Sequence, residues 1–148
     1  LLLCLGNLEN ENITLGVAVD NNIKLLGYRI DNRLYYSVEN KTLFSLDGSE
    51  KSIPLRTTKA RLLEYLLLKS GDEVITDQEL LKNIWDKYGL SSSSQRLWLV
   101  MRELKIILCG FNVSDDLFIR VENNGYLVDV AFVREVVEFT RKMKVEER

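Results

Sequence analysis

The hydrophobic pattern of the chain changes type at Pro54, its single proline. Before this point, short apolar runs alternate with turn-forming clusters, which is typical of a small antiparallel sheet. The strands are expected at 27–30, 34–38, 42–46 and 52–55. After Pro54, which lacks an amide hydrogen and is tolerated at a strand end, apolar residues recur every three or four positions, as in helices. We therefore predict an α+β fold that begins with a sheet.

A first helix of about twelve residues is predicted to begin at Thr57. Leucines recur with helical spacing from Leu63 to Leu67, and Gly71 ends the run. A threonine hydroxyl can accept a hydrogen bond from the free amides of a first turn. We therefore expect Thr57 or Thr58 to be the N-cap.

The start of a second helix has the clearest local signal in the chain. Thr76 can cap the helix, and Glu79, three residues later, can return a hydrogen bond to the cap amide. Ile75 and Leu80 have the spacing of a hydrophobic staple around this cap. The apolar face continues to about residue 87, and Gly89 is expected to end the helix.

A third helix is predicted after the serine tract 91–94, with one serine as N-cap and Gly110 as the stop. At 100° per residue, its side chains separate into two faces. The apolar face consists of Leu97, Val100, Met101, Leu104 and Leu108. The opposite face is polar, basic and aromatic at once and consists of Gln95, Trp98, Leu99, Arg102 and Ile106. We expect the first face to be core and the second to be exposed.

The remaining sequence predicts a hairpin and then a last helix. Two apolar stretches within 117–130 flank Asn123-Asn124-Gly125, and an Asn-Gly pair is a strong hairpin signal. Tyr126 is expected in the hairpin core. Beyond the hairpin, apolar residues at helical spacing predict an amphipathic helix or linker over 131–148. Its stripe consists of Val133, Val136, Val137, Thr140 and Met143.

The composition excludes several kinds of chemistry. The 148 residues include no His and two Cys, so His-based catalysis, His-liganded metals and a thiolate metal cage are excluded. Two Cys suit a reducing compartment, although one Cys4–Cys109 disulfide is compatible with the count. Asp115-Asp116 has no third ligand and is interpreted as a solvated turn. No cofactor, metal or enzymatic activity is expected. No run reaches the roughly 18 apolar residues that span a bilayer.

The order of helix, capped helix, loop, longer helix and hairpin is that of a winged helix-turn-helix. Several segments also resemble motifs of the DNA-binding domain of OmpR/PhoB-type regulators, and especially of ToxR/CadC-type regulators. The segments are Leu55-Arg56-Thr57-Thr58-Lys59 with Arg61 to Leu66, Gly71 to Thr76, Gln78 to Leu81 with Ile84-Trp85, Met101 to Lys105 with Leu108, and Asn124-Gly125-Tyr126. The leading sheet is typical of this subclass.

This resemblance implies a winged-helix DNA-binding domain over 27–130, with an extension of unknown role over 1–26. The extension opens with an apolar run, Leu1 to Leu5, which favours a short buried strand or a fragment edge. The resemblance also implies a bacterial one-component regulator, or an excised effector domain, that binds double-stranded promoter DNA as a homodimer. The loop 89–93 would be available to RNA polymerase. The protein would be cytoplasmic, with a membrane tether or membrane partner outside this chain.

Three groups of residues are candidates for DNA contact. On the third helix, Arg102 can bond guanine, Gln95 can read adenine, Arg96 can hold phosphate, and Trp98 and Leu99 can touch thymine methyl groups or ribose. Lys105 completes this group within the resembling motif. The start of the first helix favours an anion, and the hairpin can reach the minor groove or backbone. These two groups consist of Arg56, Thr58 and Lys59, and of Arg120, Asn123 and Asn124.

The charge distribution departs from the family pattern. The formal net charge is −2, but residues 56–71 and 91–108 carry +3 and +2, so the basic charge gathers on the first and third helices. Lys105 is followed by two isoleucines where an Arg-Lys cluster is common, and the hairpin tip carries Glu122. We therefore expect phosphate attraction to be weaker than in typical members.

A second hypothesis assigns the same fold to protein association. Trp98, Leu99 and Ile106 would then form an apolar patch for a protein partner, with weak or no DNA binding. The two hypotheses differ in salt dependence, because contacts to phosphates weaken steeply with salt whereas a tryptophan-centred contact does not.

Overall fold

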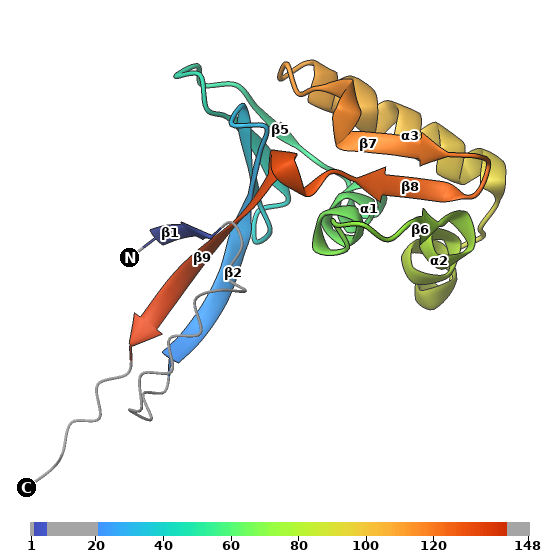
Figure 1. The fold of residues 1–148 in the computed structure, drawn as a ribbon, viewed down its shortest axis with the longest axis horizontal. Coiled ribbons are helices and arrows are strands. Elements are labelled where there is room, and N and C mark those ends of the chain that lie inside the picture. Colours follow the sequence, from blue (N-terminus) through green and yellow to red (C-terminus); the bar gives the residue numbers. More distant parts are fainter. Residues whose placement is uncertain (1, 6–20, 142–148) are drawn as a thin grey trace, which may run out of the picture.

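The computed structural model describes residues 2–5 and 21–141, arranged as two sheets and three main helices (Figure 1). The strands of the large sheet are β1 (Leu2–Leu5), β2 (Asn21–Ile30), β3 (Leu34–Ser37), β4 (Thr42–Ser45), β5 (Ser52–Pro54) and β9 (Val133–Arg141). The helices are α1 (Thr57–Leu68), α2 (Asp77–Leu80), which continues as a π-turn (Leu81–Trp85) and a 3-10 turn (Asp86–Tyr88), and α3 (Ser94–Cys109). The small sheet consists of β6 (Ile75–Thr76), β7 (Phe118–Val121) and β8 (Gly125–Val128). Short 3-10 turns occupy Asp115–Leu117 and Val130–Phe132.

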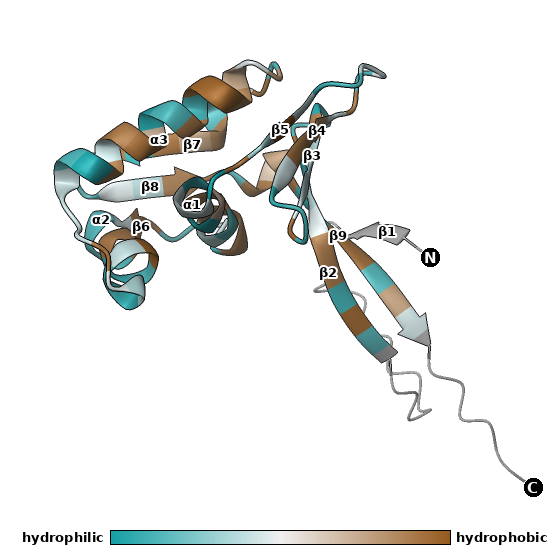
Figure 2. Cartoon of the chain, turned by 180° about the vertical axis from the view of Figure 1, so that it is seen from behind, coloured by the Kyte–Doolittle hydropathy of each residue, from teal (hydrophilic) through white to brown (hydrophobic). Residues whose placement is uncertain are grey.

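The two sheets occupy different parts of the molecule. The large sheet is antiparallel, in the order β1-β9-β2-β3-β4-β5, and the small one has the order β6-β8-β7. Figures 1 and 2 show the three helices gathered with the small sheet, while β2 and β9 extend away from them, with β1 paired to β9. This confirms the predicted α+β order of an N-terminal sheet, helices and a hairpin.

One continuous core joins the sheets and the helices. Buried residues of the large sheet, such as Tyr36 and Leu43, belong to the same apolar cluster as Trp85 and Val128. The predicted apolar face of α3 is also part of it, with Leu97, Met101, Leu104 and Leu108 buried and Val100 packed beside them. The helices therefore have fixed positions relative to the sheets.

The predicted N-cap of α1 is wrong. The capping position is Arg56, whose side chain makes no capping hydrogen bond, and the helix begins at Thr57. The predicted length of the helix is correct. The helix end is positioned by the chain that leaves β5, because the amide of Leu55 donates to the carbonyl of Lys41 at 2.7 Å. This tertiary hydrogen bond fixes the chain just before the first turn of the helix.

The predicted cap of α2 is confirmed in its main contact. The Thr76 hydroxyl accepts a hydrogen bond from the Glu79 amide at 3.1 Å, and Gly89 ends the helical run with a φ of 70°. The Glu79 carboxylate accepts a hydrogen bond from the Tyr65 hydroxyl at 2.5 Å rather than returning to the cap amide. It therefore joins α2 to α1.

The predicted hairpin is β7-β8, but its glycine has a different role from the expected one. The turn is Glu122 to Asn124, and Gly125 is already a strand residue paired with Val121. A Cβ atom on Gly125 would lie 2.1 Å from the carbonyl oxygen of Ile75. Glycine is therefore required because β6 crosses close to β8, and this contact fixes the hairpin on the start of α2.

The predicted C-terminal helix is wrong, because residues 133–141 form strand β9 between β1 and β2. Val133, Val136, Val137 and Thr140 have helical spacing, but all four are β-branched and favour a strand. Pairing with β2, which continues to Asn21, extends along the whole length of β9, and β1 pairs with its other edge at 135–138. The strand thus belongs to the large sheet. Met143 lies outside the described residues.

The apolar start of the chain forms β1, which pairs with β9. Its neighbours at 6–20 lie outside the described residues, as do the side chains of β1, Cys4 included. Cys109 has an exposed, free thiol. In the part of the chain that the structure describes, no helix is long and apolar enough to cross a membrane.

The difference between the starts of α1 and α2 predicts how two threonine substitutions affect the free energy of unfolding. Thr76→Ala should lower the free energy of unfolding by about 1 kcal/mol, because it removes the capping oxygen of α2. Thr57→Ala should change it by less than about 0.5 kcal/mol, because Thr57 is an exposed first-turn residue that does not cap. Urea denaturation followed by circular dichroism measures both. Equal losses for the two variants would show that the caps are assigned incorrectly.

Candidate nucleic-acid interface

α3 presents a continuous exposed face opposite the core. Ser93 caps the helix by accepting a hydrogen bond from the Arg96 amide at 3.1 Å, as predicted for one serine of the tract. The exposed face consists of Gln95, Trp98, Leu99, Arg102 and Ile106, as the helical periodicity predicted. Figure 2 shows hydrophobic and hydrophilic bands alternating along this helix. The face therefore offers apolar and polar groups side by side.

Two cations flank this face on opposite sides. Arg96 and Lys105 lie about 180° apart around the helix at 100° per residue. Arg96 is exposed, and Lys105 is half-buried, with its Nζ atom 5.8 Å from the ring centroid of Tyr126. Positive charge on both sides of a helix suits a groove that has an anionic backbone on each side.

Trp98 positions the arginine of the face. The Arg102 guanidinium lies 5.5 Å from the ring centroid of Trp98, within the range of a cation–π interaction. Beside these residues, a groove of about 440 Å³ separates α3 from the hairpin. It is lined by Trp98, Met101, Arg102, Lys105, Ile106, Cys109, Asp115 and Tyr126. A solvent-facing arginine thus stands at the edge of a largely apolar groove.

The start of α1 lies beside α3, as a shared interface requires. Lys59 forms an ion pair with Glu103 of α3 at 2.8 Å. Arg56 is exposed and Thr58 is half-buried. The pair brings the two basic helices together, but it also neutralises Lys59.

The hairpin residue Arg120 is bound within the protein. Its guanidinium donates two hydrogen bonds to the Asp77 carboxylate, at 2.6 and 2.7 Å, and lies 4.7 Å from the ring centroid of Tyr126. The hydrogen bonds to Asp77 raise the pKa of Arg120. Burial raises the pKa of Tyr126, whose predicted place in the core is confirmed. Arg120 therefore connects the hairpin to the start of α2.

The hairpin tip is exposed and carries little charge. Asn123 and Asn124 are both exposed, and Asn123 has a φ of 56°, which asparagine tolerates better than most residues. The carbonyl of Asn124 accepts a hydrogen bond from the Asp77 amide at 2.8 Å. The tip is thus held in place and presents two amide side chains.

A solved structure shares this arrangement. The chain is similar to the DNA-binding domain of E. coli CadC, with a TM-score of 0.55 and 20% sequence identity, over 71% of this chain and 92% of that one. The sequence matches no protein-family model and no curated protein. The similarity extends over most of both chains and is a likeness of fold.

The fold is a winged helix. Within it, α3 has the position of the recognition helix and the β7-β8 hairpin that of the wing. Figures 1 and 2 show the wing lying along α3. The fold thus brings the candidate residues of α3 and α1 together. On the wing, Asn123 and Asn124 are exposed at the tip, whereas Arg120 is bound to Asp77.

Sequence reasoning missed two residues that organise this surface. No role is predicted for Asp77 from the sequence, yet its carboxylate binds Arg120 and its amide donates to the carbonyl of Asn124. Glu103 was treated as part of a motif, yet it binds Lys59. No sequence signal pairs these residues, because their partners are 43 positions or more away along the chain.

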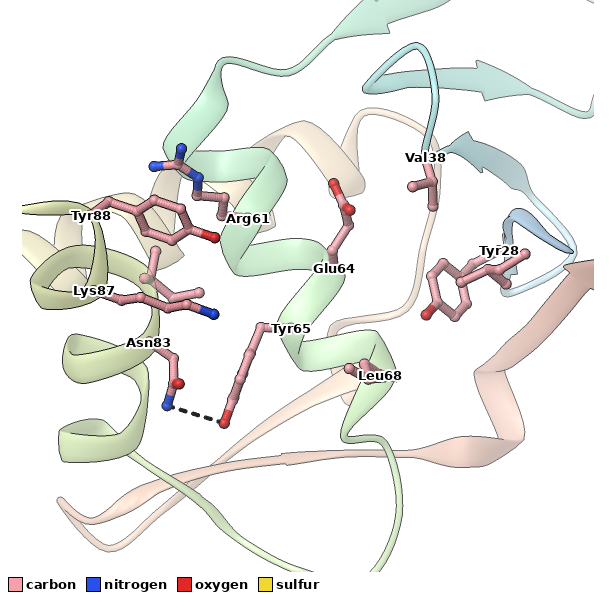
Figure 3. A pocket seen from close by; sticks show the side chains of 11 residues that line it. Tyr28, Val38, Arg61, Glu64, Tyr65, Leu68, Asn83, Lys87 and Tyr88 are labelled. Carbon is pink, nitrogen blue, oxygen red and sulfur yellow. Dashed lines mark hydrogen bonds between the residues drawn. The ribbon is translucent and has the colours of Figure 1, made fainter.

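A second cleft, of about 280 Å³, lies between the large sheet, α1 and the 3-10 turn after α2 (Figure 3). Figure 3 shows Glu64 and Tyr65 of α1 between Tyr28 on one side and Asn83 on the other. Burial and nearby carboxylates raise the pKa of Tyr28 to about 12. The acidic groups here have partners within the protein: Glu64 accepts from Tyr36 and Lys41, and Glu79 accepts from Tyr65. Two cations, Arg61 and Lys87, also line the cleft, and the Arg61 guanidinium lies 3.4 Å from the ring centroid of Tyr88.

The described residues contain no cluster of three or more side chains that could hold a metal ion.

The role of the Arg120–Asp77 ion pair, which joins the wing to α2, can be tested by amide hydrogen exchange. Asp77→Asn should lower the free energy of unfolding by about 0.5 kcal/mol, within the range for partly exposed ion pairs. Amide hydrogen exchange should also accelerate over 118–128, because the wing loses its connection to α2. Asp116→Asn, an exposed acidic residue before the wing, is the matched control. Unchanged wing exchange in Asp77→Asn would show that the pair does not hold the wing.

Proposed function

We propose that this chain is a sequence-specific DNA-binding transcription regulator. The observation that carries the proposal is the exposed face of α3 on a winged-helix fold. Gln95, Trp98, Leu99, Arg102 and Ile106 face away from the core, and basic residues flank them on both sides. α3 enters the major groove of duplex DNA, and the wing lies on the flanking groove or backbone.

The candidate residues form two groups, according to whether the side chain is already paired with a carboxylate of the protein. Arg102, Arg96 and Lys105 contact bases or phosphates, with Gln95 at a base edge and Arg56 and Thr58 at a phosphate. Asn123 and Asn124 touch the backbone or minor groove. Lys59 and Arg120 are already paired with carboxylates, so they contribute to DNA contact only after exchanging these partners.

Finer assignments follow from the resemblance of the sequence motifs. We propose a bacterial regulator of the OmpR/PhoB type, closest to the ToxR/CadC-type one-component regulators, and located in the cytoplasm. It binds DNA as a homodimer, and the exposed loop 89–93 contacts RNA polymerase. A membrane tether or membrane partner would lie outside this chain.

A second candidate function is protein association through the same face. Trp98 is 57% exposed and Ile106 is 61% exposed, and large exposed apolar groups are typical of protein contacts. The salt dependence separates the two functions. DNA affinity should fall steeply between low and physiological salt, whereas a protein contact centred on Trp98 should not.

Arg102 provides the first test of the DNA proposal. Arg102→Ala should weaken binding to promoter DNA by about 1–3 kcal/mol if the guanidinium bonds guanine. Fluorescence anisotropy at low salt measures the affinity. Arg33→Ala removes the same charge from an exposed turn between β2 and β3 and should have little effect. Equal, weak binding by the wild type and Arg102→Ala would contradict the assignment of α3.

Glu103 provides a test in which DNA affinity is expected to rise. Glu103→Gln removes a carboxylate from α3 and frees Lys59 to reach a phosphate. Affinity should rise by roughly 1 kcal/mol at low salt, and the slope of log K against log salt should steepen by about 0.9. Glu39→Gln, in the exposed turn between β3 and β4, is the control for net charge. Equal gains in both variants would mean that Lys59 does not reach DNA.

A further inference from the structure

The recognition helix leaves three large apolar side chains in solvent. Trp98, Leu99 and Ile106 are 57%, 46% and 61% exposed, and they lie on the face that the core does not use. In the major groove, base-pair edges offer hydrogen-bonding groups and one apolar group, the 5-methyl group of thymine. Given the proposed DNA binding, on which this inference rests, we infer that the protein selects its DNA by these methyl groups.

Leu99 and Ile106 carry this inference most directly. They lie two turns apart along α3 and within about 20° of each other around its axis, at 100° per residue. The distance along the axis is roughly 10 Å at 1.5 Å per residue, which equals about three base-pair steps of 3.4 Å. The pair can therefore meet thymine methyl groups about three steps apart.

The charges around the apolar residues favour DNA over a protein partner. Gln95 and Arg102 alternate with the apolar residues, and the neighbouring carboxylate, Glu103, is bound to Lys59 at 2.8 Å. Arg96 and Lys105 stand on opposite sides of the face, as the two phosphate backbones stand on opposite sides of the major groove. Apolar contacts in the centre with cations on both sides match that groove.

Trp98 supports the face in a different way. Its ring lies 5.5 Å from the Arg102 guanidinium, so substituting it would also release Arg102. Leu99 and Ile106 are aliphatic and cannot hold an arginine by a cation–π interaction. The test therefore changes these two residues and retains Trp98.

The experiment changes only methyl groups on the DNA. One A·T duplex of roughly 20 base pairs, two helical turns, is prepared with thymine or with deoxyuridine in its place. A G·C duplex of the same length is prepared with cytosine or with 5-methylcytosine. Within each pair, charge and base pairing are the same. Anisotropy titrations at low salt give the four affinities.

The wild type should bind the methylated member of each pair more tightly. The expected ratio is about fourfold for each contacted methyl group, from the transfer free energy of one buried carbon. The double variant Leu99→Asn/Ile106→Asn should lose this ratio. Leu68→Asn, a 62% exposed leucine at the end of α1, should retain it.

Two outcomes would overturn the methyl inference, and a third would overturn the proposed function. Equal affinities of the wild type for thymine and deoxyuridine duplexes overturn the methyl inference and leave the proposed DNA binding intact. A ratio that persists in Leu99→Asn/Ile106→Asn also overturns it, because these two side chains would then not be the groups that contact the methyl groups. No binding to any of the four duplexes overturns the proposed function itself, and the inference with it.

Discussion

The structure depends on the burial of α1. Its buried residues, Ala60, Leu62, Leu63, Leu66 and Leu67, cover roughly 160° of the helix at 100° per residue. This is wider than the stripe of a helix that packs on one surface only, and it brings both sheets and the other helices onto α1.

The polar edges of α1 fix the angles of this packing. Glu64 accepts hydrogen bonds from Tyr36 of β3 and from Lys41, and Tyr65 donates to Glu79 of α2. Lys59 forms the ion pair with α3. Apolar burial alone is non-directional, so these contacts decide how the neighbours are turned around the helix. The exposed face of α3 is consequently a fixed surface with a defined orientation.

Local patterns in the sequence were sufficient for most elements of the fold. The cap at Thr76, the serine cap of α3 and the turn at Asn123-Asn124 act within a few residues, so local chemistry predicts them. The apolar residues of strand β9 have helical spacing, and only their β-branched side chains favour a strand. Its partner, β2, lies more than 100 positions earlier, and local periodicity contains no record of that pairing.

The exposed side of the candidate site was predictable for the same reason. The periodicity of α3 separates its two faces without any knowledge of the rest of the chain. The sequence did not predict which basic residues of the site form ion pairs, because this depends on which carboxylates lie near them in the fold. Lys59 and Arg120 both form such pairs, with Glu103 and Asp77, although their sequence positions gave no sign of it.

This pairing changes what the net charge of −2 means for recognition. A protein that holds DNA mainly by phosphate contacts binds every sequence, since backbone charge is the same everywhere. Here, two of the candidate cations are paired with carboxylates, so the proposed DNA binding would draw less on sequence-independent phosphate contacts. Apart from Arg96, the exposed face of α3 is apolar or capable of base-specific bonds, and such groups can distinguish one sequence from another. Such a surface gives a modest affinity with a high share of specificity, and pairing two such surfaces by dimerisation or tethering raises the affinity without adding non-specific charge.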